Sequence, residues 1–357
     1  MKQGNILCGL GLMICSLLQW AIAEENAEEI VIDNDGTLIA GTLARPDGAS
    51  GNVPLVIMIS DSGAQARDAE IAGFPVFARL AEELLAAGIA SFRFDDRQTG
   101  ASSGEFAEAT MDRLAADVAV IVDHFTVFYQ QPFSHIVLLG HGQGGIVAGR
   151  LAARDTRIDK LVLMASTGVN QRRVLRHQAE TSYAGLGLPQ ALIEEEASAR
   201  EQLMFAISDE GDVAAAEAAY AQVYLKLLSH LPAGQKQNIT DKATAAVQQA
   251  AQLRASYATA QMQSFLYHDP GTDLAGLAIP VLLLFGDKDT LVDPALHAPV
   301  LEEVLADSRA EYRSIVIPDA NHLFQVAETG QVSEYPALEK AFSPALTEAL
   351  HNWLQTD

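Results

Sequence analysis

The sequence predicts an α/β fold: a mostly parallel, twisted sheet with helices on both faces and one helical insertion. Three observations support this. Short apolar runs typical of buried strands alternate with segments of helical periodicity over most of the 357 residues. Hydrophobic residues make up 49% and charged residues 19%, which excludes disorder as the main state. The alternation stops over residues 171–270, where Ala, Gln and Glu recur at helical spacing.

The expected elements follow in chain order. Residues 30–32 and 37–43 flank Asn34-Asp35-Gly36, a sequence typical of a hairpin turn with positive φ. The run from Pro54 to Ser60 is continuously apolar, as a strand buried on both faces should be. Further strands are expected at 89–94, 136–139, 161–165, 281–285 and 314–317. Helices are expected at 75–87, 111–125, from 144 to about 153, and after Ser343-Pro344, an N-cap and N1 pair.

The first 23 residues resemble a secretory signal peptide. Lys2 precedes an apolar run that is shorter than the roughly 20 residues that cross a bilayer. Ala21-Ile22-Ala23 then forms an A-x-A cleavage site. We therefore expect export to the periplasm or the medium, with no membrane span after cleavage. Both cysteines, Cys8 and Cys15, lie in this leader, so the mature chain would contain neither a disulfide nor a cysteine nucleophile.

The predicted organisation is a leader (1–23), a core (24–170 and 271–357) and a helical cap (171–270) inserted between two strands. Such an insertion lies at the carboxyl ends of the strands, where open α/β sheets bind ligands. The net charge of −23 repels phosphate backbones, so a nucleic-acid partner is not expected.

Three short motifs lie after apolar runs. Gly140-His141-Gly142-Gln143-Gly144 is a strand-to-helix turn, Gly286-Asp287-Lys288-Asp289 follows a later strand, and Asn321-His322 follows the last strand. In this order they resemble the nucleophile elbow (G-x-S-x-G), acid loop and histidine loop of the α/β-hydrolase family. The chain is similar to bacterial exported esterases related to serine aminopeptidases, which implies the α/β-hydrolase fold and a small ester or amide as ligand. No cofactor and no metal ion is expected.

The resemblance implies a role for each matching residue. His322 would be the base and acid, and Asp289 its partner, with Asp287 as the alternative acid. The backbone N–H of Gln143 would be one oxyanion donor, with a second from Ser62 or Gly63.

The sequence departs from the family at the nucleophile, because Gly142 stands where the family has serine. Glycine has no hydroxyl to attack an acyl group, although it relieves the strain of the positive φ at an elbow. The serine could have been lost naturally or changed artificially. Ser62 and Ser166 also follow strands, but neither lies on the elbow, and His141 is expected to be a packing residue. Asp95, Asp96 and Arg97 are expected to form a structural ion-pair turn.

Three functions are compatible with these residues. The protein could be an esterase-like hydrolase without its serine, whose standard hydrolysis would be absent or very weak. It could be a pseudo-enzyme that binds a small acyl or hydrophobic ligand. Alternatively, His322 and Asp289 could act directly as a general base.

Overall fold

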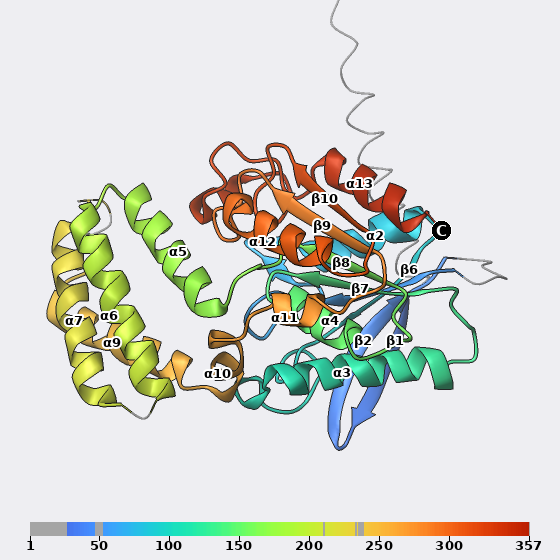
Figure 1. The fold of residues 1–357 in the computed structure, drawn as a ribbon, viewed down its shortest axis with the longest axis horizontal. Helices are drawn as coiled ribbons and strands as arrows, with labels where there is room; N and C mark the ends of the chain where they lie inside the picture. The colour runs from blue at the N-terminus through green and yellow to red at the C-terminus, as the bar shows by residue number, and fades with distance from the viewer. Residues whose placement is uncertain (1–26, 47–52, 210, 233, 235–238, 357) are drawn as a thin grey trace, which may run out of the picture.

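The computed structural model describes residues 27–46, 53–209, 211–232, 234 and 239–356. Its centre is an eight-stranded sheet in the order β1-β2-β6-β3-β7-β8-β9-β10 (Figure 1). β1, β2 and β6 pair antiparallel, and every other neighbouring pair is parallel. The strands are β1 (Ala27–Asn34), β2 (Thr37–Ala44), β3 (Leu55–Ile59), β6 (Ala90–Phe94), β7 (Ile136–His141), β8 (Lys160–Met164), β9 (Val281–Gly286) and β10 (Tyr312–Ile317). This is the α/β-hydrolase fold that the motifs predict.

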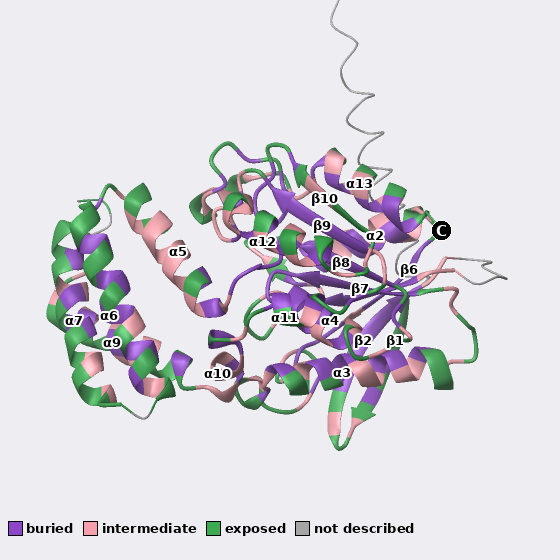
Figure 2. Cartoon of the chain, viewed as in Figure 1, coloured by how far each residue is buried: buried purple, intermediate pink, exposed green. Residues whose placement is uncertain are grey.

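Burial explains why the central strands read as continuous apolar runs. β3, β7, β8 and β9 are buried along their full length, with helices covering both faces of the sheet (Figure 2). One face packs against α3 (Met111–Asp123), α4 (Gly144–Ala152) and α12 (Pro294–Ala306). The other face packs against α2 (Val76–Ala86) and α13 (Pro344–Leu354).

The expected hairpin and helices are present with small differences at their ends. Asp35 and Gly36 have φ values of +49° and +88°, as the turn between β1 and β2 requires. α3 ends at Asp123, and a π-helical turn over His124–Phe128 continues it. Ser343 occupies the N-cap position of α13, but its side chain makes no capping hydrogen bond. A short hairpin of two strands with two residues each, β4 (Glu70–Ile71) and β5 (Phe74–Pro75), was not expected from the sequence.

The helical insertion lies between β8 and β9, and in Figure 1 most of it projects to the left of the sheet. Its helices are α5 (Gln171–Gly185), α6 (Gln190–Ser208), α7 (Val213–His230), α9 (Lys242–Tyr257) and α10 (Ala260–Leu266), and α11 (Gly271–Leu274) leads back to the core. Leu203, Met204 and Tyr220 belong to a hydrophobic cluster of its own. The insertion therefore has a core separate from that of the sheet.

A buried polar network joins three helices of the insertion. Glu196 is fully buried and forms an ion pair with Arg200, which is 8% exposed. Tyr220 Oη donates to Glu196 Oε1 at 2.7 Å, and Arg200 Nη1 donates to Tyr257 Oη at 2.9 Å. Buried charges are tolerated only when paired and hydrogen-bonded, and here both conditions are met.

The predicted leader lies outside the described residues, as do both cysteines. Among the helices that are described, none combines the length and apolar character that crossing a membrane requires.

Candidate active site

The elbow is a tight turn between β7 and α4. Gly142 has a φ of +52°, the left-handed conformation that favours glycine. Its N–H donates to Met164 O on the neighbouring strand at 2.9 Å, which fixes the turn against the sheet. A Cβ on Gly144 would collide with the backbone oxygens of Ile59 and Ser60, so the helix can approach β3 this closely only with glycine there. The turn thus keeps the shape of a nucleophile elbow without a nucleophile.

Asp289 and His322 meet beside this turn. Asp289 follows β9, and its Oδ1 accepts the N–H groups of Leu291 and Val292 at 2.8 Å each, which holds the carboxylate in place. Its Oδ2 lies 2.8 Å from His322 Nδ1. The other acid of this loop, Asp287, is exposed. The structure therefore brings together Asp289, and not Asp287, with the histidine.

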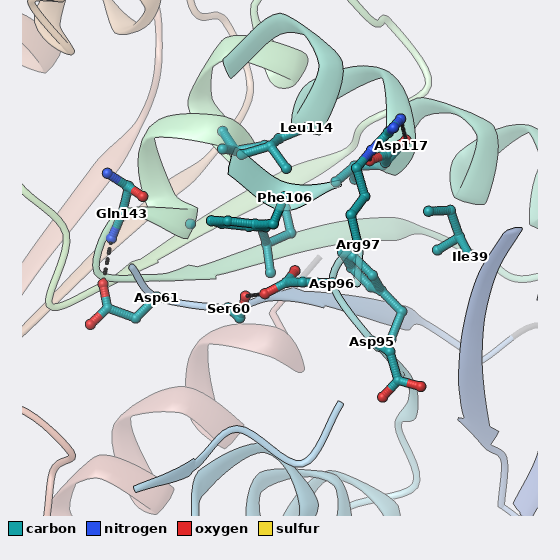
Figure 3. A pocket seen from close by; sticks show the side chains of 15 residues that line it. Ile39, Ser60, Asp61, Asp95, Asp96, Arg97, Phe106, Leu114, Asp117 and Gln143 are labelled. Atoms are coloured by element: carbon teal, nitrogen blue, oxygen red, sulfur yellow. Dashed lines mark hydrogen bonds and ion pairs between the residues drawn. The ribbon is translucent and has the colours of Figure 1, made fainter. Parts of the chain in front are cut away.

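The structure adds a third residue that sequence reasoning did not place in the site: Asp61, which comes two residues after β3 ends at Ile59. Its Oδ1 occupies the space that a Cβ on Gly142 would need. The same oxygen accepts the backbone N–H of Gln143 at 2.8 Å, as Figure 3 shows. Its Oδ2 lies 3.1 Å from His322 Nε2. Asp61 thus fills the place of a serine side chain and also uses the expected oxyanion donor.

The charges of these three residues stabilise one another. Burial alone would lower the pKa of His322, but the charge of Asp289 and hydrogen bonds to both carboxylates outweigh it and raise this pKa to about 10. Burial alone would raise the pKa of Asp61, yet the hydrogen bond and charge of His322 hold it well below its usual range. At neutral pH the site therefore contains an imidazolium between two carboxylates.

His141 supports the histidine loop from the other side. It is 1% exposed, and its Nε2 lies 3.0 Å from His322 O, so this nitrogen donates to the carbonyl. The two imidazole rings lie 4.7 Å apart, centre to centre. Burial and the nearby charge of His322 lower the pKa of His141 to about 4, so it is neutral at physiological pH. It acts as a packing and positioning residue for His322.

Asp61, His141 and His322 each offer one ligating atom, and these atoms lie within 4.8 Å of one another. A metal ion could bridge such a spacing. However, Asp61 Oδ2 and His322 Nε2 already share a hydrogen bond, and His141 Nε2 donates to a backbone carbonyl. The cluster is therefore held together by its own hydrogen bonds.

The serines considered as substitutes do not reach the histidine. Ser62 and the neighbouring Gly63 are exposed on the loop after β3. Ser166 is 2% exposed, and its Oγ lies where a Cβ on Gly145 would project. No hydrogen bond joins either hydroxyl to His322 within the described chain. The proposed second oxyanion donor, Ser62 or Gly63, stays a prediction.

A small cavity adjoins Asp61. It has a volume of about 20 Å³, which is room for about one water molecule. Figure 3 shows how Asp61, Asp96 and Phe106 lie around it. Apolar side chains form much of its wall: Ile59, Phe106, Leu114, Val118 and Val147.

Asp96 lines the same cavity. The expected ion-pair turn is present for Asp95 and Arg97 but is wrong for Asp96. Asp95 pairs with Arg67, and Arg97 pairs with Asp117, at 2.8 and 2.6 Å, as a structural ion-pair turn should. Among the residues that the structure describes, Asp96 has no basic partner: its Oδ2 accepts Ser60 Oγ–H and Gln65 N–H at 2.7 and 2.8 Å. Burial, with the charges of Asp117 and Asp95 adding to it, raises the pKa of this carboxyl to about 7.

A comparison with sequence models of protein families identifies the family of this chain. The sequence model of the family described as "Serine aminopeptidase, S33" matches residues 74–325, which include the elbow, the acid loop and the histidine loop. The chain belongs to the serine aminopeptidase (S33) family. A search of curated protein sequences gives no significant match to this S33 chain.

Solved structures similar to the S33 chain include an esterase and a proline iminopeptidase by their descriptions. An esterase from Pyrococcus furiosus has a TM-score of 0.53 at 15% identity, covering 92% of this chain and 90% of the esterase. Proline iminopeptidase from Mycobacterium smegmatis has a TM-score of 0.53 at 15% identity, with coverage of 92% and 97%. Est1E from Butyrivibrio proteoclasticus, solved with ferulic acid, has a TM-score of 0.50 at 18% identity, with coverage of 91% and 97%. At these identities the likeness shows the fold.

The S33 chain departs from the elbow pattern G-x-S-x-G at Gly142, and Asp61 fills the space beside it. Gly142 removes the hydroxyl, and Asp61 brings a carboxylate into the volume thus freed. The sequence alone shows the first change. One feature of the sequence could have indicated the role of Asp61. It stands just beyond the carboxyl end of a buried strand, where ligand-binding side chains of α/β sheets gather.

Proposed function

We propose that this S33-family protein is an exported, esterase-like hydrolase relative that binds a small, mostly apolar ligand and does not hydrolyse esters through an acyl-serine. The observation that carries the proposal is the position of Asp61. A chain that had only lost its serine would have an empty space above Gly142 and an available Gln143 N–H. Here one carboxylate occupies both.

This position also bears on the origin of Gly142. A serine at 142 in the present backbone would collide with the Asp61 carboxylate. An artificial change confined to residue 142 would leave a neighbourhood built for serine, with nothing in its place. The hydrogen bonds that Asp61 accepts from Gln143 and His322 instead support a natural replacement in which the two positions changed together.

The cavity beside Asp61 supports the ligand class. Its apolar wall favours a hydrocarbon or aromatic group, and its carboxylate end favours a polar group at one end of the ligand. The ferulic acid bound to Est1E has this kind of shape, although only the fold connects that protein to this one. Phe106 and Leu114, two apolar residues of this wall, are half-buried. Because the cavity has room for about one water molecule, a ligand of this class would enter only after part of the wall had moved.

A direct general-base role of His322 is the less favoured alternative. A general base must be unprotonated at the working pH, whereas the two carboxylates raise the pKa of His322 to about 10. The base would become available only after the charge of Asp61 had been removed.

Export is the part of the proposal that rests on residues 1–23. Cleavage after Ala23 should give a mature protein that begins at Glu24. Amino-terminal sequencing of protein recovered from the periplasm or medium of an expressing bacterium tests this. Recovery only as an uncleaved cytoplasmic chain would contradict it.

The loss of acyl-serine chemistry is tested with three variants and two assays. The assays are labelling by a fluorophosphonate and hydrolysis of p-nitrophenyl butyrate. We expect neither in the wild-type protein, and neither in Gly142→Ser, because Asp61 occupies the serine's space. The double variant Asp61→Ala/Gly142→Ser should show both, because it restores the hydroxyl and frees the Gln143 donor. Asp61→Ala alone is the control without any hydroxyl at the elbow.

Two results would contradict the proposal. One is fluorophosphonate labelling of the wild-type protein. The other is a double variant that folds, as judged by circular dichroism, yet neither labels nor hydrolyses, since the rest of the site would then not be esterase-like.

A further inference from the structure

We propose that Asp61 is a nucleophile that attacks a saturated carbon, and that the substrates are epoxides, which the protein would hydrolyse to diols. This inference rests on the proposed function, because it needs the ligand site beside Asp61 and the absence of a competing serine.

The two oxygens of Asp61 have different surroundings. Oδ1 accepts the backbone N–H of Gln143, at the amino end of α4, at 2.8 Å. Oδ2 lies 3.1 Å from His322 Nε2. The side chain is 16% exposed, so it is fixed by its neighbours and not solvated as a surface acid is. A carboxylate held by one oxygen, with the other beside a proton donor, has the arrangement of an oriented nucleophile.

The occupied oxyanion donor distinguishes between classes of substrate. An ester substrate would develop negative charge on its own carbonyl oxygen, but Gln143 N–H is already bonded to Asp61. Attack on a saturated carbon develops no such charge on a carbonyl. The tetrahedral stage comes later, when water attacks the carboxyl carbon of Asp61, and the charge then falls on the Asp61 oxygen beside Gln143. The Gln143 N–H is therefore placed to stabilise the tetrahedral intermediate that forms from an ester of Asp61 itself.

In the first step, Asp61 Oδ2 forms a bond to an epoxide carbon while the carbon–oxygen bond of the ring breaks. The ring oxygen takes the proton from His322 Nε2. The products are a hydroxyalkyl ester of Asp61 and a neutral His322. Because esterification removes the charge of Asp61, one cause of the raised pKa of His322 disappears at the moment when a base is needed.

In the second step, His322 takes a proton from water, and the resulting hydroxide attacks the carboxyl carbon of Asp61. The ester bond to the alkyl group then breaks, and the alkoxide receives the proton of the new Asp61 carboxyl group. The diol leaves, Asp61 is again a carboxylate and His322 is again protonated. The sum of the two steps is epoxide plus water giving diol, with no other reactant.

An unpartnered donor supports an oxygen-bearing ligand at this place. Gln143 is 6% exposed, its Oε1 accepts from Gln261 Nε2 at 2.9 Å, and its Nε2 has no hydrogen-bond partner among the described residues. A buried amide N–H without a partner costs stability unless a ligand or water satisfies it. Gln143 also lines the cavity next to Asp61. A ligand oxygen that reached this amide would supply its missing partner.

The experiment uses the wild-type protein and two probes, styrene oxide and butylene oxide. Excess protein reacts with the epoxide in heavy-oxygen water, and the protein is then digested and analysed by mass spectrometry. We expect diol formation and incorporation of the heavy oxygen into the carboxylate of Asp61, because water attacks the carboxyl carbon. Heavy oxygen in the diol alone, with none in the Asp61 peptide, would overturn the proposal. Formation of no diol from either epoxide would overturn it as well.

Matched variants supply a second measurement. Asp61→Asn keeps the shape of the side chain but lacks the nucleophilic carboxylate, and epoxide hydrolysis should fall by on the order of 10³-fold or more. Asp287→Asn, in the exposed part of the acid loop, should retain the wild-type rate. Equal rates in Asp61→Asn and wild type would overturn the assignment of Asp61. Restored ester hydrolysis in Asp61→Ala/Gly142→Ser, without any epoxide turnover in the wild type, would refute this inference and leave the proposed function standing.

Discussion

Asp61 Oδ1 occupies the volume into which any side chain on Gly142 would have to project. The two residues come from different loops, one after β3 and one after β7, and they meet because these strands are neighbours in the sheet. Each therefore determines what the other can be. An acid at 61 with this side-chain orientation requires glycine at 142.

This relationship predicts a measurable coupling energy. Gly142→Ala adds backbone strain and a collision with Asp61, whereas Gly88→Ala adds strain alone, because Gly88 also has a positive φ but nothing within 4 Å of its Cβ position. We expect Gly88→Ala to cost about 1 kcal/mol of unfolding free energy, and Gly142→Ala at least about 1 kcal/mol more. Urea unfolding checks both.

In the same series, Asp61→Ala/Gly142→Ala should be less destabilised than the sum of its single variants, because removing the carboxylate removes the collision. Additive effects would show that the two side chains do not compete for space.

The protonation of His322 is a second prediction. Its imidazole should titrate with a pKa of about 10, and Asp61→Asn should lower that value because one carboxylate is lost. Nitrogen-detected NMR of the histidine rings measures it, with His141, whose pKa is about 4, as an internal reference that stays neutral. A His322 pKa near 6.5 in the wild type would contradict the ion-pair description.

The same pKa has a consequence for stability. Because the folded value lies above the ordinary 6.5, the contribution of His322 is fully present below pH 6.5 and is lost as the pH rises toward 10. Asp61→Asn should therefore flatten the decline of unfolding free energy over this alkaline range. An unchanged slope would show that Asp61 does not interact with the charge of His322.

The raised pKa of Asp96 predicts that the unfolding free energy also declines over a lower pH range. Its folded pKa of about 7 lies above the ordinary 3.8, so the folded state binds more protons between these values. Its contribution is present below about pH 4 and is lost as the pH rises to about 7. Asp96→Asn should remove a pH-dependent loss of a few kcal/mol over this window, since asparagine can still accept from Ser60 and Gln65. Denaturant unfolding from pH 4 to 8 measures it, with the exposed Asp307→Asn as control. Equal slopes in wild type and Asp96→Asn would contradict the assignment.

The insertion offers a prediction on stability alone. Glu196→Gln leaves Arg200 buried without its counter-charge, which should cost about 3–5 kcal/mol. Its sequence neighbour Glu195 pairs with Lys226 at the surface, so Glu195→Gln should cost at most about 1 kcal/mol. Thermal unfolding followed by circular dichroism compares the two. Similar melting temperatures would mean that the buried network contributes little.

Most of the fold could be predicted from the sequence because burial on both faces gives the central strands a recognisable pattern. β3 and β9 are apolar throughout, and the helices between strands keep one apolar face. β4 and β5 were missed because two residues are too few to show any periodicity. The π-helical turn after α3 was also missed, since a change in hydrogen-bonding pattern leaves the apolar spacing nearly the same.

The site was less predictable. Asp289 and His322 were found because they follow strands within motifs of known order. Asp61 was not, because an acid in a loop usually interacts with solvent, and nothing in the sequence reports that its side chain turns toward position 142. The buried Asp96 was grouped with two residues that do form ion pairs, since adjacent residues in a turn can face different surroundings.

The shared volume of Asp61 and Gly142 also limits how this lineage can change. A mutation that introduces serine at 142 meets a carboxylate, and a mutation that removes Asp61 leaves an elbow without a hydroxyl or a carboxylate. Neither single step recovers an acyl-serine enzyme, and the first one destabilises the protein. Acyl-serine chemistry at this elbow would therefore require both substitutions, and only the order that removes Asp61 first avoids the collision. The pair therefore separates this sequence from acyl-serine chemistry by two substitutions and not by one.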